Sequence, residues 1–292
     1  MSESTSYNGL LAIPPSLLLV IGLAWAGSQG SAQAGAVPLF GLCMGLALLI
    51  QWIAFVPAFM ARTERFYDLT GSLTYLGVTG IAVGLGPELD ARSGLLAVLV
   101  GAWAARLGTF LFRRIHADGK DRRFDAVKQS FGRFLLAWTL QGLWICFTAG
   151  AALAAITATR SVPIQTLGWI GLLVWIAGFG IEVVSDRQKS QFRENPENKG
   201  RFISTGLWAW SRHPNYFGEI VLWTGVALIA APALQGWQYA TLISPLFVTI
   251  LLTMGSGIPL LEDRADEVWG GQPDYEAYKA STPILVPRPP RS

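Results

Sequence analysis

Charged residues are scarce in this sequence. Of its 292 residues, 14% are Asp, Glu, Lys or Arg and 52% are hydrophobic, and the mean hydropathy is +0.41. A water-soluble domain usually has about 25% charged residues. The composition therefore excludes a soluble globular enzyme of this length and indicates that lipid surrounds most of the chain.

Cysteine and histidine are each present only twice. Cys43 and Cys146 fall in apolar stretches, where a thiol is usually buried and inert, so no disulfide framework is expected. The four residues are too far apart in sequence to predict a metal site. The sequence also lacks a nucleic-acid-recognition module and the Gly-rich fingerprint of a soluble dinucleotide-binding fold, so nucleic acid is not an expected partner.

Long apolar stretches are abundant instead. A helix crosses the hydrocarbon core with roughly 20 apolar residues, and eight stretches approach that length. They run over 9–28, 36–60, 71–87, 94–112, 131–157, 165–184, 215–232 and 237–260. The third is short and glycine-rich, and only a short segment separates the last two. We therefore expect an all-α integral membrane protein with seven to eight transmembrane helices and no Rossmann domain.

The basic residues predict the orientation, because loops retained in the cytoplasm collect Lys and Arg. With eight spans, 18 of the 22 basic residues fall on one side, in the segments 61–70, 113–130 and 185–214 and in the C-terminal tail. The other side has only Arg92 and Arg160. Both termini should be cytoplasmic, in a bacterial inner membrane or, for a eukaryotic chain, in the endoplasmic reticulum. Membrane lipids are expected partners, and no obligatory protein partner is evident.

Polar residues gather around the end of the sixth apolar stretch. Glu182 and Asp186 are four residues apart and share one face of a helix, and Arg193 follows two turns later. Carboxylates at this place could bind an amide or a ribose. The stretch 206–210 is amphipathic and aromatic, and we expect it to lie at the membrane surface.

The run SRHPNY opens the next helix. Pro214 suits the first helical position, and His213 should lie just outside the helix. Together with Arg212, the unpaired backbone amides at this start form an anion site. Asn215 and Glu219 are four residues apart and should project from one face into the protein.

Two charged residues inside apolar spans are functional candidates, because such groups are costly in a membrane unless they have a partner. Glu219 is one of them, with a purely structural role as the alternative. Arg106 in the fourth span is the other, and Glu219 or a cofactor phosphate is a possible partner for it.

The run GLWAWSRHPNYFGE, preceded by IEVVSDRQKSQFR, resembles the C-terminal domain of the steroid 5α-reductase family over roughly residues 165–287. The closing segment, in which Glu262-Asp263-Arg264 is followed by Tyr275 and Tyr278, is similar to the end of sterol C14 reductases. Isoprenylcysteine methyltransferases carry similar RHP-x-Y and acidic-Tyr segments, so the resemblance specifies the superfamily better than the reaction.

This resemblance implies NADPH-dependent reduction of the conjugated C=C bond of a 3-oxo-Δ4 steroid or a similar isoprenoid-like enone. Within one integrated membrane domain, residues 1–130 would form the substrate side and residues 131–292 the NADPH side. Glu182 replaces an Asn of the steroid enzymes, which removes an amide donor. The residues expected around NADPH are Arg106, Glu182, Asp186, Arg193, Arg212, His213, Asn215, Tyr216, Glu262 and Arg264.

The reaction needs a hydrogen-bond donor at the substrate carbonyl, because hydride attack at the β-carbon builds negative charge on that oxygen. The family uses a Glu and a Tyr from neighbouring N-terminal helices, but this chain matches those positions poorly, and Trp103 occupies the apparent tyrosine position. The segment TERFYDLTGSLTYL offers substitutes, although Asp68 could equally cap a helix. The catalytic candidates are Glu64, Tyr67, Asp68 and Glu219, with Tyr75 as a further alternative.

Two other classes of function remain open. The same helical core could bind S-adenosylmethionine and methylate a lipid-attached thiol or amine. The long lead-in before SRHPNY and the Asn–Glu pair of NYFGE resemble the reductases more closely. The third class is a lipid-binding scaffold without turnover. This class is compatible with the poor match at the positions where the family polarises the substrate carbonyl.

Overall fold

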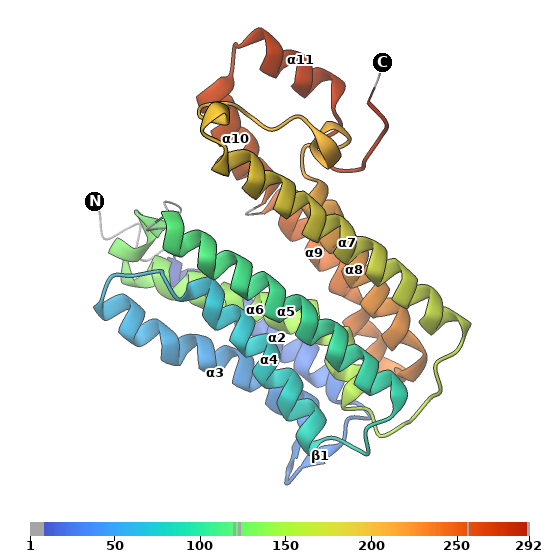
Figure 1. Cartoon of the computed structure of the whole chain (residues 1–292). Helices are drawn as coiled ribbons and strands as arrows, with labels where there is room; N and C mark the ends of the chain where they lie inside the picture. Colours follow the sequence, from blue (N-terminus) through green and yellow to red (C-terminus); the bar gives the residue numbers. More distant parts are fainter. Residues whose placement is uncertain (1–8, 119–120, 122–123, 256, 291–292) are drawn as a thin grey trace. The chain divides into compact units, whose positions relative to one another are not determined.

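The computed structural model describes residues 9–118, 121, 124–255 and 257–290 (Figure 1). These residues are almost entirely helical and contain one short hairpin of strands β1 (Gln33–Ala34) and β2 (Val37–Pro38). They divide into two compact units. Unit 1 comprises Met1–Gly168 and Ala227–Ser244, and unit 2 comprises Trp169–Val226 and Pro245–Ser292.

The long helices are named as in Figure 1. They are α2 (Ile13–Ser28), α3 (Leu39–Met60), α4 (Tyr67–Leu85), α5 (Ala91–Asp118), α6 (Phe131–Ile156), α7 (Thr166–Glu194), α8 (Pro214–Ala230), α9 (Ser244–Met254), α10 (Ile258–Trp269) and α11 (Pro273–Ser281). Short 3₁₀ helices lie between them at Val127–Gln129, Pro196–Asn198, Gly206–Ala209, Ala231–Ala233 and Gly236–Ile243.

Seven helical segments within the described residues are long and apolar enough to cross a membrane. They are Gly9–Ser28, Leu39–Met60, Ala91–His116, Phe131–Ile156, Thr166–Glu194, Pro214–Ala233 and Gly236–Trp269. The predicted class, an all-α multi-pass membrane protein, is therefore confirmed. The glycine-rich third stretch forms α4, which is not among the seven. Its 19 residues nevertheless give it a length of roughly 28 Å, close to the thickness of a hydrocarbon core.

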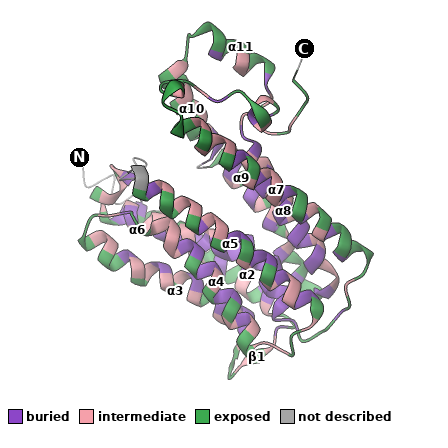
Figure 2. Cartoon of the chain, viewed as in Figure 1, coloured by how far each residue is buried: buried purple, intermediate pink, exposed green. Residues whose placement is uncertain are grey.

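The centre of unit 1 is α6, which contacts α2, α3, α4 and α5 (Figure 2). Every residue from Ile145 to Ala158 is buried, so the second half of α6 is covered around its whole circumference. The outer helices instead expose large apolar side chains such as Leu18, Ile53 and Val98. A helix that is apolar on its outward face suits a lipid environment, where exposed hydrophobic surface carries no cost.

The connecting loops of unit 1 gather at its two ends. At one end, Glu64 between α3 and α4 pairs with Lys128 between α5 and α6. At the other end, Ser31 beside the hairpin forms a β-bridge with Ala158 after α6. Two of the four predicted basic segments belong to unit 1, and their described residues within 61–70 and 113–130 adjoin this first end, whereas Arg92 in the first turn of α5 and Arg160 after α6 lie at the second. This separation follows the charge pattern of the sequence; which end faces the cytoplasm stays a prediction.

In unit 2, glycines let α7 and α8 approach until their backbones touch. A Cβ atom added to Gly218 on α8 would lie 2.6 Å from the carbonyl oxygen of Gly178 on α7. One added to Gly225 would lie 2.6 Å from the Trp175 amide nitrogen. Small residues at such a seam allow close helix packing in membranes, and here they determine the spacing of the two helices that carry most of the candidate site.

The loop between α7 and α8 packs against α7 and α11. The indole nitrogen of Trp208 in this loop donates to the Ser185 carbonyl at 3.0 Å, and the Tyr278 hydroxyl of α11 donates to the Trp208 carbonyl at 2.7 Å. Lys189 lies over the Trp208 ring, 4.3 Å from its centroid. Trp208 is therefore buried, whereas Trp210 points outward.

Candidate cofactor site

The site begins at the start of α8. Pro214 is the first helical residue and His213 lies just before it, as the sequence predicts. The Nε2 atom of His213 is 2.7 Å from Oε1 of Glu262 on α10, and Nη1 of Arg212 donates to Oε2 of the same carboxylate. One carboxylate thus holds two basic side chains that adjoin the helix start.

His213 is buried, and this burial lowers the pKa of its imidazole, with the neighbouring Glu262 carboxylate opposing the shift in part. The neutral imidazole must carry its proton on Nε2 to donate to Glu262, which leaves a lone pair on Nδ1. Among the described residues, neither His213 Nδ1 nor the buried Nε of Arg212 has a hydrogen-bond partner. The site therefore offers a ligand one acceptor and one cationic donor.

A second pair joins α7 to α8. The Asn215 side-chain amide donates to Asp186 Oδ1 at 3.2 Å, so the two predicted cofactor residues are brought together. Glu182 lies one turn before Asp186, and both carboxylates are buried. Glu219 is also buried, one turn beyond Asn215 on α8. Such a concentration of buried carboxylates is costly without partners or a ligand.

The remaining predicted cofactor residues differ in exposure. The Tyr216 ring stacks on the His213 ring with their centroids 5.6 Å apart. Arg193 lies in the last turn of α7 and Arg264 lies on α10, and both are exposed. Arg106 belongs to unit 1, where its guanidinium lies 5.1 Å from the centroid of the Phe110 ring.

A polar cluster beside Glu262 was not predicted from the sequence. The Tyr275 hydroxyl donates to Asp266 at 2.9 Å, and Lys279 contacts the same carboxylate at 2.6 Å. Burial and this hydrogen bond raise the pKa of Tyr275. The four-residue spacings of Glu262 with Asp266 and of Tyr275 with Lys279 place each pair on one helical face, which is the signal that could have revealed the cluster.

Three of the four catalytic candidates lie in unit 1, around the start of α4. Glu64 has 2% relative exposure; it accepts from Lys128 at 2.6 Å and from the Asp121 amide at 3.0 Å. The Tyr67 hydroxyl donates to the Ala137 carbonyl at 2.8 Å, and Asp68 lies in the first turn of α4. Both Glu64 and Tyr67 therefore have structural contacts, and their catalytic role stays a prediction.

Tyr75 and Trp103 are in contact, with ring centroids 5.1 Å apart in an edge-to-face arrangement. Trp103 occupies the position where the resemblance predicts a tyrosine, so Tyr75 brings a phenol next to that position from the neighbouring helix. The fourth candidate, Glu219, belongs to unit 2. No cluster of possible metal ligands occurs in the part of the chain that the structure describes.

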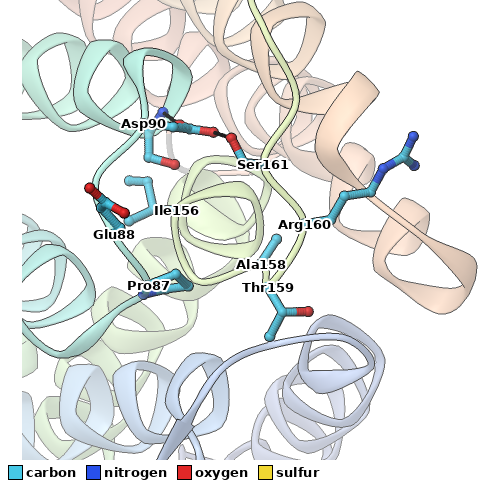
Figure 3. A pocket seen from close by; sticks show the side chains of 9 residues that line it. Pro87, Glu88, Asp90, Ile156, Ala158, Thr159, Arg160 and Ser161 are labelled. Atoms are coloured by element: carbon cyan, nitrogen blue, oxygen red, sulfur yellow. Dashed lines mark hydrogen bonds between the residues drawn. The ribbon is translucent and has the colours of Figure 1, made fainter.

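A cavity of about 180 Å³ lies at the hairpin end of unit 1 (Figure 3). Asp90 in its wall accepts from the Ser93 amide and the Ser161 hydroxyl, each at 2.7 Å. Burial raises the pKa of Asp90, but these hydrogen bonds outweigh it and lower the pKa overall. Ligand pockets usually measure roughly 300–1,000 Å³, so this cavity is small for a ligand, and Asp90 serves as the N-terminal cap of α5.

The fold and these contacts define a multi-pass helical membrane protein with a buried polar site at the start of α8. The sequence pattern of a family described as "Protein of unknown function (DUF1295)" matches residues 54–282. The chain belongs to this family.

Several curated proteins are similar to parts of the chain. A bovine protein named 3-oxo-5-alpha-steroid 4-dehydrogenase 1 is 36% identical over 24% of this chain and 27% of its own. The Delta(14)-sterol reductase of Neurospora crassa is 35% identical over 29% of this chain and 18% of its own. A probable O-methyltransferase, ustE, of Ustilaginoidea virens is 29% identical over 36% and 42%.

The chain spans about half or less of the length of the curated relatives it matches. No solved structure matches it.

Proposed function

We propose that this protein is a membrane reductase that uses NADPH to reduce the conjugated C=C bond of a lipid-soluble enone, such as a 3-oxo-Δ4 steroid or an isoprenoid-like lipid. The observation that carries the proposal is the Arg212–His213–Glu262 cluster with its two buried nitrogen atoms that lack partners among the described residues. The relatives named as steroid and sterol reductases support the same class of reaction.

The residues of unit 2 suit a phosphorylated dinucleotide. The backbone amides at the start of α8 and the guanidinium of Arg212 attract phosphate oxygens, and Glu262 fixes the direction of that guanidinium. Arg193 and Arg264 add exposed positive charge. The Asp186–Asn215 pair offers an acceptor and an amide to a ribose or a carboxamide. NADPH would supply the hydride.

The substrate carbonyl requires a donor from this chain. Glu64, Tyr67, Asp68 and Glu219 remain our candidates, and Tyr75 is the alternative beside Trp103. The Tyr67 hydroxyl can donate to the substrate carbonyl only after it gives up its hydrogen bond to the Ala137 carbonyl. Glu64 accepts from two donors in the structure, so its first role there is to hold the loop before α6.

Methyl transfer from S-adenosylmethionine is the second candidate function, supported by the relative named as a probable O-methyltransferase. The same anion site could hold the carboxylate of that ligand. Reduction remains the better proposal because Arg193 and Arg264 add exposed positive charge to that of Arg212, which suits several phosphate charges rather than one carboxylate.

Thermal unfolding of the detergent-purified chain with NADPH, NADH or S-adenosylmethionine distinguishes these functions. A ligand at about one hundred times its dissociation constant stabilises the folded state by roughly 2.7 kcal/mol, so NADPH should raise the melting temperature clearly. Arg212→Gln should abolish this shift, whereas Arg187→Gln, an exposed change on α7, should keep it. A shift with S-adenosylmethionine alone would establish methyl transfer instead, and no shift with any ligand would favour the scaffold.

A further inference from the structure

The C-terminal segment Pro283–Arg288 runs along the residues that precede α8. The Arg212 amide donates to the Pro283 carbonyl at 2.9 Å, and the Arg288 amide donates to the Trp210 carbonyl at 2.9 Å. Between them, the buried Ser211 hydroxyl donates to the Leu285 carbonyl at 2.8 Å. Three hydrogen bonds thus attach this segment to Trp210–Arg212.

The position of α8 determines where this segment lies. Pro214 begins a helical segment that is long and apolar enough to cross a membrane, and Trp210 is four residues earlier. Four residues span at most about 14 Å even when fully extended, and the headgroup layer on each side of the hydrocarbon core is roughly 5–8 Å thick. Trp210 and the segment attached to it are therefore at or next to the headgroup layer.

The outward face of the segment has the chemistry of that layer. Ile284 and Val286 are 42% and 57% exposed and alternate with the less exposed Pro283 and Leu285, as in an extended strand. Trp210, 43% exposed, lies beside them. Tryptophan is enriched at membrane interfaces, so these side chains suit the boundary between headgroups and acyl chains.

The charge of the segment selects the kind of lipid. From Thr282 to the C-terminus the sequence has two arginines, Arg288 and Arg291, and no acidic residue. Arg288 is exposed, and its backbone is bonded to Trp210. We propose that Trp210, Ile284, Val286 and Arg288 form a surface that binds the interfacial layer of a bilayer containing anionic phospholipids. This proposal is independent of the proposed reductase activity.

A fluorescent label on the full chain tests the proposal. Val286→Cys would be labelled with an environment-sensitive maleimide, since the two native cysteines are buried, and reconstituted in nanodiscs of phosphatidylcholine with or without phosphatidylglycerol. Ala277→Cys is the matched control, because Ala277 is exposed on α11 and lies outside the segment Pro283–Arg288. A nitroxide on the lipid headgroup should quench the label at 286 several-fold more than the label at 277.

Phosphatidylglycerol should increase this quenching. Arg288→Gln should remove the increase, because one basic residue near an anionic surface strengthens the attraction to it roughly fivefold. Equal quenching at 286 and 277 would overturn the lipid contact. Equal quenching at 286 in both lipids would overturn the recognition of anionic headgroups. Hydrogen exchange of the unmodified chain is the check on the substitutions. The amides of Ile284, Leu285, Val286 and Arg288 should exchange more slowly in nanodiscs with phosphatidylglycerol, and unchanged exchange would contradict the proposal.

Discussion

The backbone of Gly218 on α8 lies directly against the backbone of Glu182 on α7. A Cβ atom at position 218 would come within 2.7 Å of the Glu182 amide nitrogen, a distance at which the helices would have to separate. This contact places the buried Glu182 and Asp186 beside Asn215, so a residue without a side chain positions three polar ones.

Replacement of this glycine should therefore damage both stability and the site. Gly218→Ala should destabilise the protein by about 1–3 kcal/mol, as overpacking does, and should weaken NADPH binding. The control is Gly180→Ala on α7, where an added Cβ meets nothing within 4 Å and the gain in helix propensity makes the change neutral or slightly stabilising. Thermal unfolding in one detergent compares the two variants. Equal effects of the two changes would refute the tight seam.

Stability should depend on the protonation of His213. Because burial lowers the pKa of the folded-state imidazole, the unfolded chain binds its proton first. The contribution of the neutral ring is complete above the unfolded pKa of about 6.5 and is lost as the pH falls through the lower folded pKa. The wild type should therefore lose more stability than His213→Gln between about pH 8 and pH 5. Parallel curves for the two proteins would contradict this assignment.

The Glu64–Lys128 pair should contribute to stability whether or not Glu64 takes part in catalysis. Leaving one member of a buried pair alone typically costs about 3–5 kcal/mol, although the 15% side-chain exposure of Lys128 reduces this value. Lys128→Met should therefore destabilise the protein, and the double variant Glu64→Gln/Lys128→Met should recover part of the loss. A double-mutant cycle by chemical unfolding measures this coupling; additive effects would show that the pair contributes nothing.

Arg92 should be essential for folding at the hairpin end of unit 1. Its side chain is 1% exposed and donates to the carbonyls of Val162, Pro163 and Ile229. Arg92→Met would leave these acceptors unsatisfied, at about 1–3 kcal/mol for each one that water cannot reach. Arg160→Met is the control, because Arg160 is exposed and should tolerate the change. The yield of monodisperse protein and its melting temperature provide the measurement, and similar values for both variants would argue against this role.

The membrane environment, the fold class and the local geometry at the start of α8 could all be predicted from the amino-acid sequence. Apolar length and the distribution of Lys and Arg are local properties, and Pro214 restricts its own dihedral angle and that of His213. These features need no knowledge of which helices are neighbours. The helix α4 shows the limit of hydropathy, since its polar residues and glycines make it weakly apolar although it connects both ends of unit 1.

Which polar groups contact one another depends on the packing of the helices and could not be predicted from the sequence. Glu262 is about fifty residues from Arg212 and His213, and Lys128 is 64 residues from Glu64. Spacing along one helix predicts neighbours at three and four residues, but it says nothing about partners on another helix. Those partners depend on how the helices pack. For Asp186 on α7 and Asn215 on α8, the close contact of Gly218 with the α7 backbone sets the spacing through the absence of a side chain.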